Sequence, residues 1–279
     1  MRALVLSGGG AKGAWQAGVI ERLLRTTRYD VLCGTSVGAI HAAFLAQHRL
    51  GDEAAAGTAL IGWWRALRQR DVYRSWFLGP MAAAWKLSLY DAAPLATLLR
   101  RGLDPAKIAT SGHRLRVGAV SLRTGCRRVW TEHDEDVVTG VLASASMPVA
   151  FQPVAINGDL YTDGGIADGT PLADAIEAGA DTIDCVLLSP ENPELPMRYR
   201  SALDVGKASL EVMLGEIERW DLRVAEMVNN EVAHGRTDRR RVRVRVLRPS
   251  KLLGDALDFS PTSVRERLAL GSDDAAGWV

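Results

Sequence analysis

The stretch Asp30-Val31-Leu32-Cys33-Gly34-Thr35-Ser36-Val37-Gly38, continued by the largely apolar run 39–45, decides the fold of this chain. Its first residues predict a short buried strand, and residues 37–45 predict a buried helix. Between them stands G-x-S-x-G, the pattern of a sharp strand-to-helix turn in which small residues lift a serine hydroxyl clear of the sheet. The amino end of the following helix would favour negative charge beside Ser36. Taken alone, the pattern also suits a glycine-rich turn with a capping serine.

A second glycine motif lies upstream of the elbow. Residues 1–6 predict an apolar strand, Ser7-Gly8-Gly9-Gly10-Ala11-Lys12-Gly13 follows, and residues 14–25 predict a helix that packs on the sheet. Consecutive glycines permit positive φ and close approach, so their N–H groups can converge on one anionic oxygen. The order strand, helix, strand predicts a right-handed βαβ unit of a parallel sheet. Together the two motifs predict a nucleophile, Ser36, beside an oxyanion hole formed by the 8–10 turn.

Composition sets broad limits on the function. The chain has 279 residues, which suits one α/β domain over 1–279, and its net charge of +1 gives no case for nucleic acid as a partner. With 47% hydrophobic and 24% charged residues, it has the composition of a soluble globular protein. No apolar run reaches the roughly 18 residues that span a bilayer, and the first residues predict a core strand rather than a signal peptide. We expect a cytoplasmic protein whose membrane contact is at most peripheral.

The cysteines give no sign of a disulfide framework or a zinc site. Cys33, Cys126 and Cys185 are widely spaced and form no C-x-x-C pair. We therefore expect buried structural thiols in a reducing compartment.

The rest of the chain continues the alternation of helices and strands. Asp91 is a candidate N-cap, and Asn157-Gly158 predicts a type I′ hairpin that delivers Asp163-Gly164-Gly165. We expect a motif-bearing core over about 1–180 and a C-terminal part of the same domain over 201–279. Helices are predicted over 51–70, 92–101, 136–146, 171–178, 201–235 (one long helix or two) and 263–270, and strands over 114–122, 127–131, 151–156, 160–162, 182–188 and 241–247.

Residues 70–90 form an aromatic segment with two interpretations. It is either an ordinary cap packed beside the core or an apolar lid and acyl-chain wall over the site. The sequence does not separate the two. The residues in question are Tyr73, Trp76, Phe77, Leu78, Met81, Trp85, Leu87, Leu89 and Tyr90.

Arginines crowd the stretch 236–248, where residues 241–247 alternate strictly between arginine and an apolar residue. The alternation predicts a strand with one basic face. A solvated edge strand protected by charge is the favoured interpretation, and docking of anionic lipid headgroups is the second.

Taken together, these motifs resemble the signatures of the patatin-like phospholipase family. The glycine turn, Gly34-Thr35-Ser36-Val37-Gly38 and Asp163-Gly164-Gly165 occur in family order, and the stretch 143–151 resembles the segment that precedes the family's aspartate. The resemblance covers about residues 1–179. It implies a three-layer α/β/α fold with a mainly parallel central sheet.

The resemblance also implies a site and a reaction. Patatin-like enzymes use a Ser–Asp dyad, which places the base at Asp163 and the nucleophile at Ser36, with no cofactor and no metal. The implied oxyanion hole is Gly8, Gly9 and Gly10, and the implied reaction is hydrolysis of a lipid or fatty-acyl ester through an acyl-enzyme. Motif support is expected from Lys12, Gly13, Gly34, Gly38, Gly164 and Gly165, while Ser144, Ser146 and Pro148 are expected to be structural.

Other bases and other functions remain to be weighed. The five histidines, His41, His48, His113, His133 and His234, lie in no motif and are interpreted as surface or capping residues. Asp159 and Asp168, which flank Asp163, are interpreted as turn residues. An α/β-hydrolase would place its serine after more strands than precede Ser36.

Three further functions stay open at this point. A general carboxylesterase or thioesterase of the same fold is one alternative. A dinucleotide-binding module is another, because Gly8, Gly10 and Gly13 satisfy G-x-G-x-x-G; however, Asp30 precedes the second strand instead of ending it. An inactive scaffold is disfavoured because Ser36 and Asp163 are both present.

Overall fold

The two strands predicted around the glycine motifs lie side by side near the middle of an eight-stranded sheet. The computed structural model describes residues 1–77, 85–191, 199, 201–237 and 241–278. The strand order is β10-β9-β1-β2-β5-β8-β7, with β6 paired to β5. The parallel strands are β1 (Arg2–Leu6), β2 (Val31–Gly34), β5 (Arg114–Ser121), β9 (Thr182–Val186) and β10 (Arg243–Leu247), and the antiparallel ones are β6 (Arg127–Thr131), β7 (Val154–Ile156) and β8 (Asp159–Asp163).

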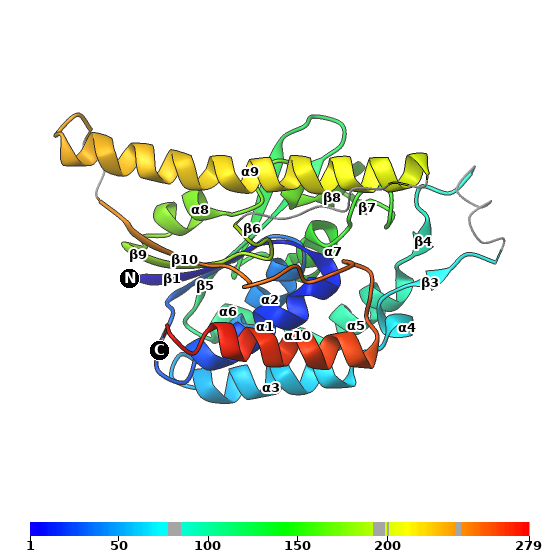
Figure 1. Ribbon diagram of the computed structural model, residues 1–279, viewed down its shortest axis with the longest axis horizontal. Coiled ribbons are helices and arrows are strands. Elements are labelled where there is room, and N and C mark those ends of the chain that lie inside the picture. Colours follow the sequence, from blue (N-terminus) through cyan, green and yellow to red (C-terminus); the bar gives the residue numbers. More distant parts are fainter. Residues whose placement is uncertain (78–84, 192–198, 200, 238–240, 279) are drawn as a thin grey trace.

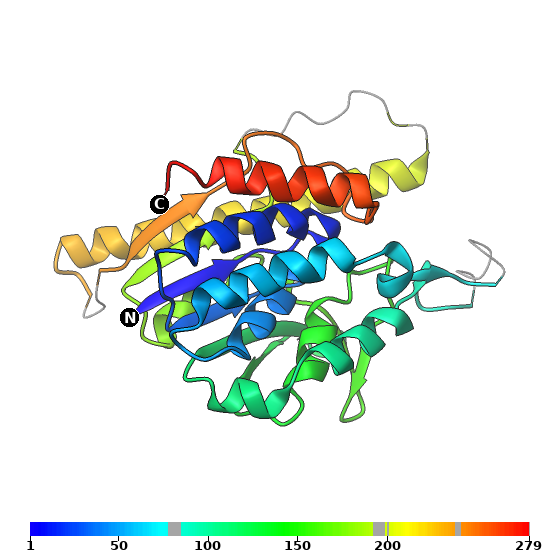
Figure 2. The same cartoon turned by 90° about the horizontal axis from the view of Figure 1, so that it is seen from below.

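Helices cover both faces of this sheet (Figures 1 and 2). In Figure 1, α8 and α9 lie above the sheet, and α1, α3 and α10 lie below it. The helices are α1 (Gly13–Leu23), α2 (Val37–Ala46), α3 (Glu53–Ala66), α4 (Gln69–Val72), α5 (Ala93–Gly102), α6 (Pro105–Thr110), α7 (Val137–Ser144), α8 (Leu172–Glu177), α9 (Ala202–Ala233) and α10 (Pro261–Asp274), with 3-10 turns η1 (Gly10–Lys12) and η3 (Gly164–Ile166).

Alternation along the buried strands produces the two cores. Leu4 and Leu6 of β1 point into the large core shared with α1, α2, α3, α7 and α10. Ala3 and Val5 point the other way, into a smaller core with α8 and part of α9. Because both faces of β1 are covered, the strand can be apolar throughout. The fold is thus α/β with a mostly parallel central sheet flanked by helices, as expected.

The register of β5 brings the third motif to the serine elbow. Val117 of β5 lies opposite Gly34 of β2, and Ala119 lies opposite Asp163 of β8. Strand β6 pairs with β5 over residues 116–120, so it occupies the other edge. Strands β2 and β8 therefore follow one another along the same edge of β5, and the chain beyond Gly34 meets Asp163.

Several element boundaries differ from the predictions. The predicted helix 51–70 is two helices, α3 and α4, because the chain is extended at Leu67 and Arg68. Helix α6 was not predicted, and α10 is longer than the expected 263–270. The predicted long helix is a single one, α9. The Asn157-Gly158 turn is confirmed, since both residues have positive φ, 52° and 79°.

The aromatic segment divides into a packed part and an exposed part. Tyr73 is buried against Tyr90 and Phe151, beside the small sheet of β3 (Arg74–Ser75) and β4 (Tyr90–Asp91). Trp85 and Leu87 are exposed. Leu78 and Met81 lie outside the described residues. Asp91 accepts the Ala93 N–H, but the N-cap of α5 is Ala92, one residue after the predicted position.

The arginine-rich strand β10 is the edge strand that the alternation predicted, but its basic face is not fully solvated. Arg245 binds Asp184 with both ends of its guanidinium, at 2.6 and 2.8 Å, and Asp184 is fully buried. Just after the strand, Arg248 binds Glu218 of α9 at 2.8 Å. The interpretation as a simple wet face was wrong at Arg245, because that arginine neutralises a buried carboxylate.

Candidate active site

Ser36 occupies a strained turn between β2 and α2. Its φ of 58° and ψ of −124° place it in a region that non-glycine residues rarely adopt. The turn is possible because its neighbours lack side chains: a Cβ on Gly34 would lie 2.1 Å from the Gly38 oxygen, and one on Gly38 would lie 2.1 Å from the Leu6 oxygen. Backbone strain of this kind occurs where a reacting group must be presented.

Asp163 ends β8 directly beside this serine. Its carboxylate accepts the Gly165 N–H at 2.8 Å. Burial raises the pKa of Asp163 to about 6, and the nearby Ser36 hydroxyl and the Gly165 N–H only partly offset the effect. The group is therefore mostly ionised at neutral pH, yet much more basic than an ordinary carboxylate.

The glycine turn approaches Ser36 from β1. A Cβ on Gly8 would lie 2.8 Å from Ser36 Cβ and 3.6 Å from its Oγ, so the backbone of this turn is packed against the serine. Gly9 and Gly10 have φ of 156° and 56°, and Ala11 N–H is bound to the Ala256 oxygen. Within the described parts of the chain, the N–H groups of Gly8 and Gly9 donate to no other residue.

The supporting motif residues have structural contacts. Lys12 Nζ lies 3.4 Å from Glu211 of α9 and thus links the glycine turn to that helix. A Cβ on Gly13 would lie 2.4 Å from a methyl group of Val37, and one on Gly164 would lie 2.2 Å from the Gly118 oxygen. These glycines let the three motifs approach one another.

Ser144, at the end of α7, contacts the nucleophile candidate directly. Its Oγ accepts the Ser36 backbone N–H at 3.0 Å. Ser146 supports the partner strand, since its carbonyl accepts the Asp163 N–H and the Thr162 hydroxyl. The sequence marked both serines only as structural, and the bond to Ser36 joins residues too far apart for a local pattern to reveal it.

His41 lies on α2, one turn beyond Ser36, and is fully buried. Its Nε2 accepts the Trp64 indole N–H, and its Nδ1–H donates to Gln16 Oε1, both at 2.8 Å. Gln16 in turn donates to the Ser7 and Val186 carbonyls. Burial lowers the pKa of His41 to about 3, so the ring is neutral. The interpretation of His41 as a surface or capping residue was wrong.

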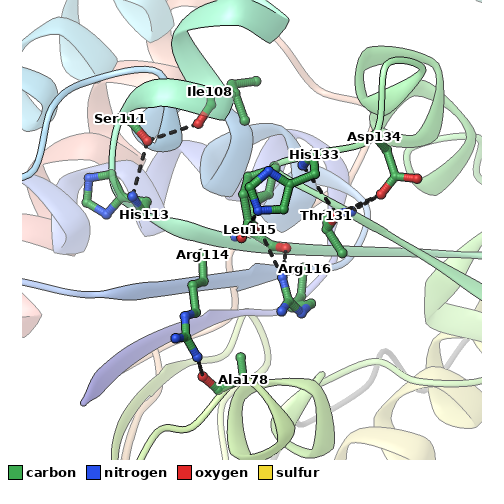
Figure 3. A network of polar contacts seen from close by, with 11 residues as sticks. Ile108, Ser111, His113, Arg114, Leu115, Arg116, Thr131, His133, Asp134 and Ala178 are labelled. Carbon is green, nitrogen blue, oxygen red and sulfur yellow. Dashed lines mark hydrogen bonds and ion pairs between the residues drawn. The ribbon is translucent and has the colours of Figure 1, made fainter.

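His113 and His133 lie at the other end of the sheet, around the start of β5 (Figure 3). His113 is also buried, and its Nδ1–H donates to the Tyr29 carbonyl at 2.9 Å. Its pKa is lowered, chiefly by burial. His133 is exposed beside Glu132. Since β5 runs parallel to β2, neither ring is at the carboxyl end where Ser36 lies.

A second buried polar cluster contacts the elbow through Thr35, the residue before Ser36. Arg127 of β6 pairs with Asp168, at 3.1 Å, and with Asp174 of α8. The Asp168 carbonyl accepts the Thr35 hydroxyl at 3.0 Å, which ties this cluster to the residue before Ser36. Burial raises the pKa of Asp168. Asp168 is therefore more than a turn residue.

The remaining candidates contribute to structure elsewhere. Asp159 accepts the Ser121 hydroxyl at 2.6 Å, at the far end of β8 from Asp163. Cys33 and Cys185 are buried thiols, as expected, but Cys126 is exposed. Asp30 accepts the Arg2 N–H before β2 begins, so it is not the acidic strand end of a dinucleotide site. Across the described residues, no group of three or more His, Cys, Asp or Glu side chains is arranged to hold a metal ion.

Comparison with known proteins identifies the family of this chain. A family model described as patatin-like phospholipase matches residues 4–176. An uncharacterized NTE family protein of Mycobacterium tuberculosis is 31% identical over 189 residues, which cover 67% of this chain but only 49% of that protein. The human calcium-independent phospholipase A2-gamma is 24% identical over 225 residues, covering 69% of this chain and 27% of that protein. VipD from Legionella pneumophila has a solved structure that aligns over 99% of this chain and 66% of its own, with a TM-score of 0.47 and 14% identity.

Proposed function

Because the chain belongs to the patatin-like phospholipase family, we propose that it is a serine acyl hydrolase that cleaves lipid carboxylic esters. Ser36 is the nucleophile and Asp163 is the base. The observation that carries the proposal is a strained serine whose hydroxyl is near enough to a buried carboxylate to lower its pKa, which burial nevertheless raises to about 6. A base whose pKa lies near neutrality combines ionisation with proton affinity.

The reaction follows from the positions of these groups. Asp163 accepts the Ser36 proton as Oγ attacks the ester carbonyl, and the Gly165 N–H holds the carboxylate in place. The carbonyl oxygen becomes an oxyanion beside the 8–10 turn, whose free N–H groups stabilise it. The alcohol or lysolipid leaves with the proton, and a water molecule deprotonated by Asp163 releases the fatty acid. The chain needs neither a metal nor a cofactor for these steps.

The substrate class rests on the family. Phospholipids and lysophospholipids come first, with glycerides, simple carboxylic esters and thioesters as alternatives. Residues 85–90 run beside residues 149–150, through backbone hydrogen bonds from Leu89 and Tyr90, and we assign this segment to an acyl-chain wall. In the described parts of the chain, none of the helices has the length and hydropathy that crossing a bilayer requires. We propose a single catalytic domain that acts in the cytoplasm and meets membranes peripherally.

Labelling by a fluorescent fluorophosphonate tests the nucleophile. Wild type is expected to react, and Ser36→Ala is expected to lose the label completely, while Ser144→Ala keeps it, because Ser144 offers only a backbone contact. Retention of the label in Ser144→Ala would show that the probe does not react with this neighbouring hydroxyl. If folded wild type stays unlabelled both with and without detergent micelles, the protein has no activated serine. The proposed activity would then be wrong, and the chain would be a non-catalytic family member.

A second assay separates the substrate classes. The purified protein is offered phospholipid vesicles, lysophospholipid micelles, acyl-coenzyme A and short p-nitrophenyl esters, with Ser36→Ala as the blank. Release of fatty acid from phospholipid or lysophospholipid supports the phospholipase assignment. Turnover of the short esters alone would replace it by a general esterase, and turnover of the thioester alone by a thioesterase.

A further inference from the structure

Helix α9 exposes an apolar stripe on the side that it turns away from the sheet. The stripe consists of Met213, Trp220, Val224 and Met227, which are 61%, 59%, 40% and 58% exposed. Their spacing places them on one face of the helix. Figures 1 and 2 show α9 lying across the outside of the molecule, with its C-terminal end projecting past the sheet. Exposed large side chains that gather in a row of this kind mark an interaction surface.

The stripe is part of a longer heptad pattern. Two half-buried residues complete it, Leu210 before the stripe and Ile217 within it, so that apolar residues recur at alternating steps of three and four. This is the seam of a coiled coil, in which each apolar side chain inserts between residues of a facing helix. Among the described elements, none covers the outer part of this seam. The six seam positions are Leu210, Met213, Ile217, Trp220, Val224 and Met227.

The charges beside the seam are arranged to match a second copy of the same helix. Glu216 and Arg223 border it at equivalent heptad positions, and both are exposed. In an antiparallel pair, equivalent positions of this kind face each other, so Glu216 of each copy faces Arg223 of the other. A parallel pair would instead place Glu216 near Asp221, which is unfavourable. The pattern therefore selects the antiparallel arrangement.

The apolar layers agree with the same arrangement. A two-fold axis that passes close to Arg219 brings Leu210 against Met227 of the second copy, Met213 against Val224 and Ile217 against Trp220. Each contact occurs twice, because the interface is isologous.

A lipid surface is the less suitable occupant of the stripe. The exposed side of α9 carries four glutamates, and the structure pairs two of them, Glu211 and Glu231, with Lys12 and Arg236. With Arg219 and Arg223, the charges on this side balance. Interfacial helices that bind anionic membranes have an excess of basic residues on their polar face, which this side lacks.

We propose that α9 is a dimerisation element, through which two copies of this chain pair by antiparallel packing of their heptad seams. The proposal does not depend on the catalytic assignment. The two sheets would lie on opposite sides of the helix pair, since the seam points away from the body of each copy.

Charge reversal provides the test, with mass measured by light scattering after gel filtration. Wild type is expected at twice the chain mass of 30.2 kDa. Glu216→Arg and Arg223→Glu are each expected to dissociate, with dimer affinity weakened on the order of tenfold or more, because two attractive pairs become repulsive. Mixing the two variants restores the dimer, since every cross-pair then joins an arginine to a glutamate.

Glu226→Arg is the matched control, because it reverses a glutamate of the same helix that points away from the seam. It is expected to remain dimeric. Monomeric wild type, single variants that stay dimeric, or a mixture that stays monomeric would each overturn the proposal. Should a charge variant fail to fold, as judged by far-UV circular dichroism, Trp220→Gln with Met227→Gln tests the apolar layers independently, and persistence of the dimer would count against them.

Discussion

Asp163, at the end of β8, and His41, on the helix that follows Ser36, are two buried titratable groups, and they differ in whether an acceptor site is still free. Both ring nitrogens of His41 are bound, one to Trp64 and one to Gln16. Asp163 accepts the Gly165 N–H and lies near the Ser36 hydroxyl, which lowers its pKa. Burial moves both pKa values toward the neutral form, to about 3 for the histidine and about 6 for the aspartate.

This difference shows that proximity to a serine does not by itself make a base. His41 has no lone pair free for a proton, and accepting one would cost it the Trp64 hydrogen bond. Asp163 can accept a proton where it stands. The histidine therefore belongs to the packing of α2, whereas the aspartate suits the role of base in the proposed reaction.

The largest expected effect comes from replacing each of the two titratable groups by an amide. Asp163→Asn is expected to lower kcat/KM for an ester by about 10³-fold or more, because an amide cannot take the serine proton. His41→Gln is expected to retain activity within about tenfold once the folded fraction is accounted for. Steady-state hydrolysis of a p-nitrophenyl ester measures both. An active Asp163→Asn together with an inactive, folded His41→Gln would invert the comparison.

The second effect concerns the glycine turn of residues 8–10, which packs against Ser36. Gly8→Ala is expected to lower kcat/KM by about 10²-fold, since its methyl group would lie 2.8 Å from Ser36 Cβ and displace the N–H groups of the turn. Gly62→Ala on the exposed side of α3 is the control, because an added Cβ there meets nothing within 4 Å. The control is expected to be fully active and slightly more stable. Equal activity of the two variants would show that the glycine turn does not serve the reaction.

The third effect is on stability, and here the histidine dominates. His41→Ala is expected to lower the free energy of unfolding by about 2–4 kcal/mol, because it leaves a cavity and deprives the buried Trp64 indole and Gln16 amide of partners. Urea unfolding followed by circular dichroism measures the loss. His48→Ala, on the same helix, is the control and should cost less, because the His48 ring is only half-buried and bonds to the Phe44 carbonyl on its own helix. A loss below about 1 kcal/mol for His41→Ala would contradict the packing role.

Much of this arrangement was predictable from sequence because it depends on local patterns. Glycines at fixed offsets predicted the elbow at Ser36, and Asn157-Gly158 predicted the hairpin that carries Asp163. Helix α6 also had a local signal, since Asp104 caps it and Pro105 begins it, so its omission was avoidable.

The rest depends on pairings between distant residues. Nothing near Ser144 in the sequence shows that its hydroxyl binds the Ser36 N–H, because 108 residues separate them. The same holds for the Gln16–His41–Trp64 network and for the Arg127 brace behind Thr35. The position of Asp163 beside Ser36 came from the family resemblance, and its physical cause, the shared edge of β5, is a property of the sheet.

The smallest of these effects, and the most direct probe of the difference between the two groups, is the dependence on pH. Asp163 must be ionised to act, so kcat/KM is expected to fall about tenfold per unit below a midpoint near pH 6. Stability changes with opposite signs at the two groups. The raised pKa of Asp163 means that the folded state takes up a proton first, which stabilises the fold as pH falls from about 6 to the unfolded value of 3.8. The lowered pKa of His41 means that the unfolded state is protonated first, which destabilises the fold as pH falls from 6.5 toward 3.

The two contributions separate in single variants. Asp163→Asn removes the cost of a buried charge, and it is expected to unfold less readily than wild type at pH 8, with the advantage shrinking by pH 5. Thermal melts of wild type and Asp163→Asn at both values measure this, and circular dichroism at each pH confirms that the acid loss of activity is not unfolding. An activity midpoint near pH 4, or an Asp163→Asn variant without extra stability at pH 8, would mean that water reaches the carboxylate. Asp163 and His41 would then differ in burial as well as in their hydrogen-bond partners, and burial would shift the pKa of His41 alone.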